Sequence, residues 1–319
     1  MYKRKIKKLL TPFKVILFMP YYNYRLYKYR KKPFKKINVL LRTNNLLTLA
    51  LQSQTTGISG KENTGKKIIV SLTTHGKRIH DVFLTIESLF LQSIKADKIV
   101  LWLSETEFCR DNIPEMLKKA EKRGLTIEFC KDIRSYTKLI PSLAKYPDDL
   151  IITVDDDSLY PFDMIEKLVV AYRKRPDVIH CHRAHKIVFS KDGRLEDYKK
   201  WGLCSSNTVP SLTIVPTGAG GILYFPGCFH EDIANEELFL KLSPHGDDLW
   251  FKAMSLLKNV KCGIIEEQDN SISRRIEMEG SQANSLWSRN KNPREGNNTQ
   301  IAAVFNHYKE LNSIIRQVE

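Results

Sequence analysis

Short apolar runs alternate with segments of helical periodicity between residues 67 and 181. The apolar runs predict buried β-strands, and apolar positions three and four residues apart predict the helices between them. Because the connections are short, the order predicts an α/β fold with a doubly wound, mostly parallel sheet flanked by helices. The predicted strands are 68–72, 99–103, 125–130, 150–154 and 178–181, and the predicted helices are 79–90, 114–123, 137–145 and 161–175.

The pattern is less regular beyond residue 181. A strand is predicted at 222–225, a helix at 247–257 and a strand at 260–265, followed by polar sequence and a helical end. Three regions are therefore expected: a basic N-terminal arm and linker at 1–65, a catalytic domain at 66–267, and a C-terminal loop and helix closing the site at 268–319. Within the first region, the polar composition of residues 43–65, with several Gly, Ser and Thr, predicts the linker.

One predicted strand ends in three acids, Asp155, Asp156 and Asp157. Ligands of open α/β sheets bind beyond the carboxyl ends of the strands. Alternation along extended backbone would point Asp155 and Asp157 one way and Asp156 the other. Carboxylates of this kind suit Mg2+ or Mn2+, so Asp155 and Asp157 are the candidate metal ligands. A solvated turn that caps the next helix is the alternative.

A second acidic pair, Asp247 and Asp248, stands where a helix is predicted to begin. Capping requires only one acid. The second is then available as a general base, because a like-charged neighbour raises a carboxyl pKa. Both residues are therefore candidate catalytic groups.

Further candidates follow the other strands and precede the strand at 222–225. The loop after the first strand lacks both the dinucleotide-binding and the P-loop glycine patterns, but a nucleotide could lie across these strand ends. Asp132 could accept a hydrogen bond from a base or ribose, and Lys138 could meet a diphosphate. A glycine run would let backbone approach a ligand. The candidate donor-binding residues are Thr73, Arg78, Asp132, Lys138, Asp155, Asp156, Gly218, Gly220 and Gly221.

Charge is concentrated at one end of the 319-residue chain. Residues 1–42 hold fourteen Lys or Arg and no acid, whereas the rest has 37 basic and 36 acidic residues. With nine interleaved aromatics, the arm predicts docking on an anionic membrane surface, with a partner-binding tail or nucleic-acid binding as alternatives. Six cysteines without Cys-x-x-Cys spacing favour free thiols in a reducing compartment. No run reaches the roughly 18 apolar residues of a membrane span.

Several motifs together resemble bacterial GT-A-type, family-2-like glycosyltransferases of capsule and lipopolysaccharide clusters. They include Val154-Asp-Asp-Asp157 and Thr217-Gly-Ala-Gly-Gly221, and the remaining matching segments are 69–79, 99–104, 132–141, 181–185 and 247–254. The resemblance implies a nucleotide-sugar donor and Mn2+ or Mg2+. It implies that Asp155 faces ribose or sugar, that Asp157 binds metal, and that Asp247 or Asp248 is the base. The loop 217–221 would border the sugar and the acceptor.

The residues alone do not choose between sugar transfer, nucleotidyl transfer and phosphodiester hydrolysis. The resemblance implies a metal-dependent, inverting glycosyltransferase acting on a lipid-linked or growing glycan acceptor. It is expected in the cytoplasm, peripherally bound to the inner face of the membrane. Two alternatives remain at this point: a sugar nucleotidyltransferase, and a non-enzymatic membrane- or nucleic-acid-binding module that uses the arm.

Overall fold

The structure is a computed structural model that describes residues 36–59, 65–204, 209–265, 276–278 and 296–316. The chain divides into two compact units, residues 1–48 and 49–319. Most of the predicted basic arm, residues 1–35, lies outside the described residues. Among the residues that are described, no helix is both long and apolar enough to cross a bilayer.

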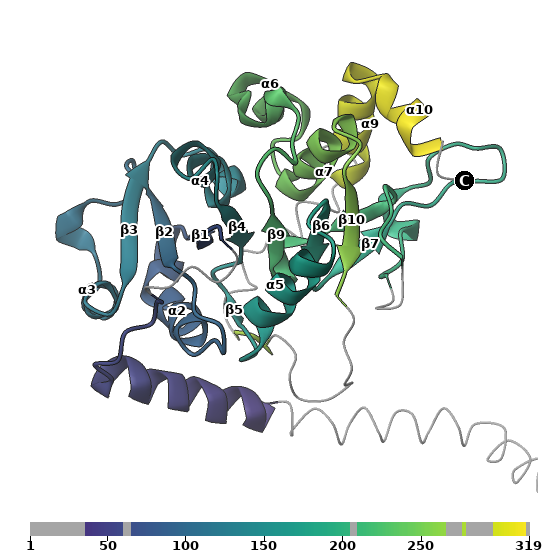
Figure 1. Cartoon of the computed structure of the whole chain (residues 1–319). Helices are drawn as coiled ribbons and strands as arrows, with labels where there is room; N and C mark the ends of the chain where they lie inside the picture. Colours follow the sequence, from purple (N-terminus) through teal and green to yellow (C-terminus); the bar gives the residue numbers. More distant parts are fainter. Residues whose placement is uncertain (1–35, 60–64, 205–208, 266–275, 279–295, 317–319) are drawn as a thin grey trace, which may run out of the picture. The chain divides into compact units, whose positions relative to one another are not determined.

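A seven-stranded sheet forms the centre of residues 49–319 (Figure 1). Its strand order is β10-β6-β9-β4-β1-β2-β3. Every pairing is parallel except those of β9, which runs antiparallel to both neighbours. The predicted α/β fold with a mostly parallel sheet is confirmed. The strands are β1 (Ile68–Thr73), β2 (Lys98–Ser104), β3 (Leu125–Cys130), β4 (Leu150–Thr153), β6 (Val178–Cys181), β9 (Ile222–Tyr224) and β10 (Lys261–Ile264).

Helices cover both faces of this sheet because successive strand residues alternate in direction. In β1, Ile68 and Val70 pack into one apolar cluster with α2 and α5. Ile69 packs into the other cluster, with α7. The α-helices are α2 (Val82–Phe90), α3 (Glu115–Glu121), α4 (Ile140–Lys145), α5 (Met164–Lys174), α6 (Glu236–Leu242), α7 (Asp247–Leu257), α9 (Asn297–His307) and α10 (Glu310–Arg316).

Several short elements surround the main sheet. Two-stranded pairs join β5 (Ser158–Leu159) to β11 (Ile276–Glu277), and β7 (Ala184–Lys186) to β8 (Ile214–Pro216). The 3-10 helices are η1 (Gly76–His80), η2 (Arg110–Asn112), η3 (Arg134–Lys138), η4 (Tyr198–Lys200), η5 (Gly218–Gly220) and η6 (Glu231–Ala234).

The direction of β9 places the glycine-rich turn at the functional edge of the sheet. Parallel strands present their carboxyl ends at one edge, and ligands bind there. Because β9 is antiparallel to β4 and β6, the beginning of β9 lies at this edge, next to the ends of those two strands. The segment that precedes it, which contains η5, is therefore brought beside the end of β4.

The predicted linker at 43–65 was wrong in two parts. Residues 36–52 are helical. Residues 53–59 are then bonded to the main unit: the Gly57 N–H donates to the Arg123 carbonyl at 2.8 Å, and the Ser59 N–H donates to the Ala96 carbonyl at 2.8 Å. A Cβ at Gly57 would overlap the ring of Phe90. Buried Arg123 also pairs with Glu87 at 2.5 Å. The polar composition of residues 53–59 suggested a loop, but backbone groups of this segment form specific hydrogen bonds with Arg123 and Ala96.

Candidate active site

The acidic triplet follows β4 rather than continuing it. Because extended backbone ends at Thr153, the expected alternation of the three side chains is wrong. Arg78 instead bridges two of them, at 2.7 Å from Asp156 and 3.3 Å from Asp157. Burial raises the pKa of Asp156, while the charge of Arg78 and a hydrogen bond from Thr74 act against that rise.

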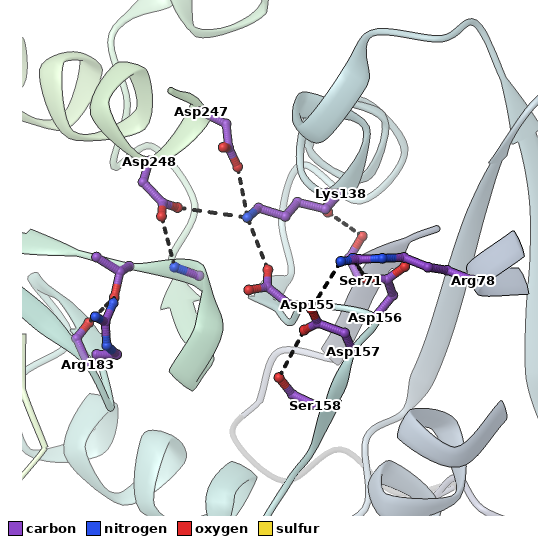
Figure 2. Close-up of polar contacts among 12 residues, drawn as sticks. Ser71, Arg78, Lys138, Asp155, Asp156, Asp157, Ser158, Arg183, Asp247 and Asp248 are labelled. Carbon is purple, nitrogen blue, oxygen red and sulfur yellow. Dashed lines mark hydrogen bonds and ion pairs between the residues drawn. The ribbon is translucent and has the colours of Figure 1, made fainter. Parts of the chain in front are cut away.

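Lys138 connects the triplet to the second acidic pair (Figure 2). Its ammonium nitrogen lies 2.8 Å from Asp247, 3.4 Å from Asp155 and 3.8 Å from Asp248. Burial opposes charge on Lys138, but the three carboxylates outweigh it and raise the pKa of this residue well above its ordinary value. The structure therefore brings the separately predicted clusters together around one protonated lysine.

Side chains of η3 bind the segment between α6 and α7, which explains how Lys138 is positioned. The Tyr136 hydroxyl donates to the Ser243 carbonyl at 2.5 Å, and Arg134 donates to the Pro244 carbonyl at 3.1 Å. On its other side, the Ser71 hydroxyl of β1 donates to the Lys138 carbonyl at 2.6 Å. Sequence reasoning did not select Ser71 or Tyr136, since a single serine or tyrosine carries no recognisable spacing.

Neither acid of the second pair caps α7. The N-cap residue is Gly246, and no side chain caps the helix. Asp248 instead accepts a hydrogen bond from the Gly218 N–H at 3.0 Å. Burial raises the pKa of Asp248 to about 7; the negative charges of Asp247 and Asp155 add to the rise, while the Lys138 ammonium and the hydrogen bond from Gly218 oppose it. The Asp248 side chain is 28% exposed, whereas that of Asp247 is 8% exposed.

The glycine-rich turn closes one side of this cluster. A Cβ on Gly218 would lie 2.6 Å from the Lys138 nitrogen and 3.0 Å from an Asp155 oxygen. The absence of a side chain is therefore required for the lysine to occupy its place. The turn is held by Arg183, which donates to the Thr217 hydroxyl at 2.6 Å (Figure 2). Arg183 was not among the predicted site residues.

The remaining predicted residues lie outside the lysine cluster. The Thr73 hydroxyl donates to the Trp102 carbonyl at 3.0 Å, within the sheet. The Asp132 carboxylate accepts from the Arg134 N–H at 2.7 Å, which stabilises the start of η3. Gly220 packs against the backbone of Arg183, and Gly221 has a φ of 95° that favours glycine.

The histidines and cysteines form no second reactive centre in the described part of the chain. His180, His182 and His185 each have a ring nitrogen bonded to a backbone carbonyl. All six cysteines are free thiols, and burial raises the pKa values of Cys181 and Cys228.

Two carboxylates of the triplet are the candidate ligands for a divalent cation. Within the described residues, no group of three or more His, Cys, Asp or Glu side chains is arranged to hold a metal ion by itself. Asp155 and Asp157 supply hard oxygen ligands at one edge of the sheet, and both are partly exposed. Mg2+ commonly takes only one or two protein carboxylates and completes its coordination with substrate phosphates and water. The donor set is compatible with that arrangement.

Comparison with known proteins gives weak similarity. No protein-family model matches the chain. No curated protein matches it either. Among solved structures, it is similar to a CMP:2-keto-3-deoxy-manno-octonic acid synthetase complexed with CTP, with 11% identity, a TM-score of 0.37, and coverage of 63% of this chain and 90% of the other.

Two transferases have comparable similarity. A mannosyltransferase from Pyrobaculum calidifontis, in complex with GDP-Man and Mn2+, has 14% identity and a TM-score of 0.39, with coverage of 73% of this chain and 64% of the other. GalNAc-T7 with UDP, GalNAc and Mn2+ has 13% identity and a TM-score of 0.41, with coverage of 71% and 46%. The chain thus spans less than two thirds of either transferase. With all TM-scores below 0.5, the case for a function depends on the chain's own residues.

Proposed function

We propose that this protein is a metal-dependent glycosyltransferase that moves a sugar from a nucleotide-sugar donor to a hydroxyl of a glycan or lipid-linked acceptor, with inversion. The observation that carries the proposal is the meeting of two acidic clusters at Lys138. One cluster suits a cation and a diphosphate, and the other contains a carboxylate whose pKa is raised to about 7. Both features accelerate displacement of a phosphate-bearing leaving group by a hydroxyl.

Asp248 is the better candidate for the base. It is the more exposed member of the pair, and its pKa lies near neutral pH, where a general base is most effective. Asp247 lies closer to Lys138 and is nearly buried, so its role is to hold the lysine. In the proposed step, Asp248 takes the acceptor hydroxyl proton, the acceptor oxygen bonds to the anomeric carbon, and the bond from that carbon to the diphosphate breaks.

The donor would lie along the edge formed by the ends of β1 and β4. Asp155 and Asp157 would hold Mn2+ or Mg2+, which would neutralise charge on the departing diphosphate. Arg78 keeps Asp156 and Asp157 in place. Gly218, with no side chain, leaves room for the Lys138 ammonium beside Asp155 and Asp248. We assign the remaining candidates, Thr73, Asp132, Gly220 and Gly221, to the borders of the donor site.

The proposal extends to location and pathway class. The cations of residues 1–42 would bind the enzyme peripherally to the anionic inner face of a bacterial membrane. A lipid-linked acceptor of capsule or lipopolysaccharide synthesis would be presented there. The division into an arm, a catalytic domain at 66–267 and a closing segment at 268–319 belongs to the same proposal.

The test is thermal stabilisation by UDP, GDP, CDP and CMP, each with and without Mn2+. A nucleotide at 100 times its dissociation constant should add about 2.7 kcal/mol to the free energy of unfolding. We expect one nucleotide to stabilise the wild type only with Mn2+, and Asp157→Ala to abolish this response. The exposed residue Asp111 lies outside the site, so Asp111→Ala is the control. Absence of a response to every nucleotide would refute the donor site.

Product analysis separates the enzyme alternatives. A glycosyltransferase releases a nucleoside diphosphate or monophosphate from a nucleotide sugar, whereas a sugar nucleotidyltransferase releases pyrophosphate from a nucleoside triphosphate and a sugar phosphate. A non-enzymatic module would release neither, and its binding to vesicles or nucleic acid would be unchanged by Asp157→Ala.

A further inference from the structure

Residues 36–52 form a helix (Figure 1), and a stripe of its apolar side chains is exposed. At about 100° per residue, five large aliphatic residues fall within an arc of about 120°. Leu40 and Leu41 are 65% and 63% exposed. Leu46 and Ala50, on another side of the helix, are buried. The exposed stripe consists of Ile37, Leu40, Leu41, Leu47 and Leu51.

This concentration of exposed apolar side chains is unusual within the described part of the chain. Ten large hydrophobic residues are exposed there, and half of them belong to this one helix. Single exposed hydrophobics are ordinary on protein surfaces, whereas a contiguous patch marks an interaction site. The other five are scattered in sequence: Leu91, Phe162, Val170, Leu203 and Val209.

Charge identifies the kind of partner that this stripe fits. Residues 36–52 contain Lys36 and Arg42 and no acid, and residues 1–42 contain fourteen cations and no acid. A second copy of the chain would bring two such cationic segments together, which is unfavourable. An anionic lipid surface satisfies both properties, because headgroups attract the cations and the acyl region accepts the leucines.

We propose that the helix 36–52 lies in the membrane interface and inserts its Ile37–Leu51 stripe among the acyl chains of anionic lipids. The arm would supply long-range attraction, and the stripe would fix the depth and orientation of the enzyme's attachment. This inference rests on the membrane location proposed above and specifies which surface of the protein would contact the membrane. It is independent of catalysis, so its test measures binding rather than turnover.

The test compares sedimentation of the full chain with vesicles of phosphatidylcholine alone and with added phosphatidylglycerol. Replacing two inserted leucines with polar residues removes most of their transfer free energy, so Leu40→Asn with Leu41→Asn should weaken partitioning onto anionic vesicles roughly tenfold or more. The matched control is Leu203→Asn with Val209→Asn, whose side chains are similarly exposed. It should bind like the wild type.

Quenching by brominated acyl chains tests the orientation. Leu40→Trp places an indole on the stripe, and Asn38→Trp places one about 160° around the helix. We expect quenching above the wild-type background for the first variant and not for the second. Equal quenching, or unchanged binding of the double-asparagine variant, would overturn the inference while leaving arm-mediated binding intact.

Two other results have distinct meanings. Failure of the wild type to bind anionic vesicles would overturn both the stripe and the proposed membrane location, but not the donor site. A wild-type dimer that the Leu40 and Leu41 changes dissociate, with vesicle binding unaltered, would replace the lipid with a second copy of the chain.

Discussion

Replacement of Gly218 by alanine is the most direct test of the lysine-centred site. The new methyl group would lie 2.6 Å from the Lys138 nitrogen, whereas ordinary contact begins at 3.4 Å. The lysine end would therefore have to move by about 0.8 Å, because the alternative is to shift backbone. If the 2.8 Å distance between the Lys138 nitrogen and the Asp247 oxygen increases by about 0.8 Å, the attraction between the two charges weakens by about 1 kcal/mol at an effective dielectric constant near 20.

The effect on turnover should exceed the effect on stability. Displacement of a reacting or positioning group by about 1 Å can lower a rate by about 100-fold. We therefore expect the Gly218→Ala variant to release nucleotide from its donor about 100-fold more slowly, with a melting temperature near that of the wild type. Gly202→Ala is the control, since a Cβ at Gly202 meets no atom within 4 Å. A Gly218→Ala enzyme with wild-type turnover would refute the reasoning.

Three further predictions concern the same cluster. Asp248→Asn should lower kcat by about 100-fold to 10,000-fold while leaving Mn2+-dependent nucleotide stabilisation intact, as measured by paired kinetics and thermal shift; a variant with full activity would exclude Asp248 as the base. Because burial raises the pKa of Asp248 to about 7 and the base must be deprotonated, kcat/KM should rise with pH up to about 7 and then level off. An acid limb near pH 4 in a profile from pH 3 to 9 would contradict this assignment. Lys138→Met leaves the carboxylates without their cation, so the free energy of unfolding from urea denaturation should fall by about 3–5 kcal/mol; an unchanged value would mean that the pairs contribute little.

The strands were predictable because their side chains are nearly all apolar. The predicted bounds of β3 and β6 match the structure, and the helix predicted at Asp247 begins there. The direction of β9 was not predictable, since its three residues carry no signal for parallel or antiparallel pairing. That direction brings Gly218 beside Asp155, a contact between residues far apart in sequence.

The chemistry of the candidate site was predicted by residue type but not by arrangement. Asp155, Lys138 and Asp247 were each candidates, yet no periodic pattern indicates that one ammonium would contact all of them. The alternation assigned to the acidic triplet failed because strand geometry ends at Thr153. Beyond that residue, Asp156 and Asp157 are held by Arg78, which belongs to η1.

The binding of residues 53–59 to the main unit has a practical consequence for protein production. A shortened protein that begins at residue 66 would lack Gly57, which lies against the ring of Phe90. It would also lack the backbone N–H groups that donate to the carbonyls of Arg123 and Ala96. It would open the buried pair of Arg123 and Glu87 to water on that side. A start at residue 49, where the main unit begins, retains these contacts and omits the cationic segment, which makes it the better choice for crystallisation of the catalytic unit.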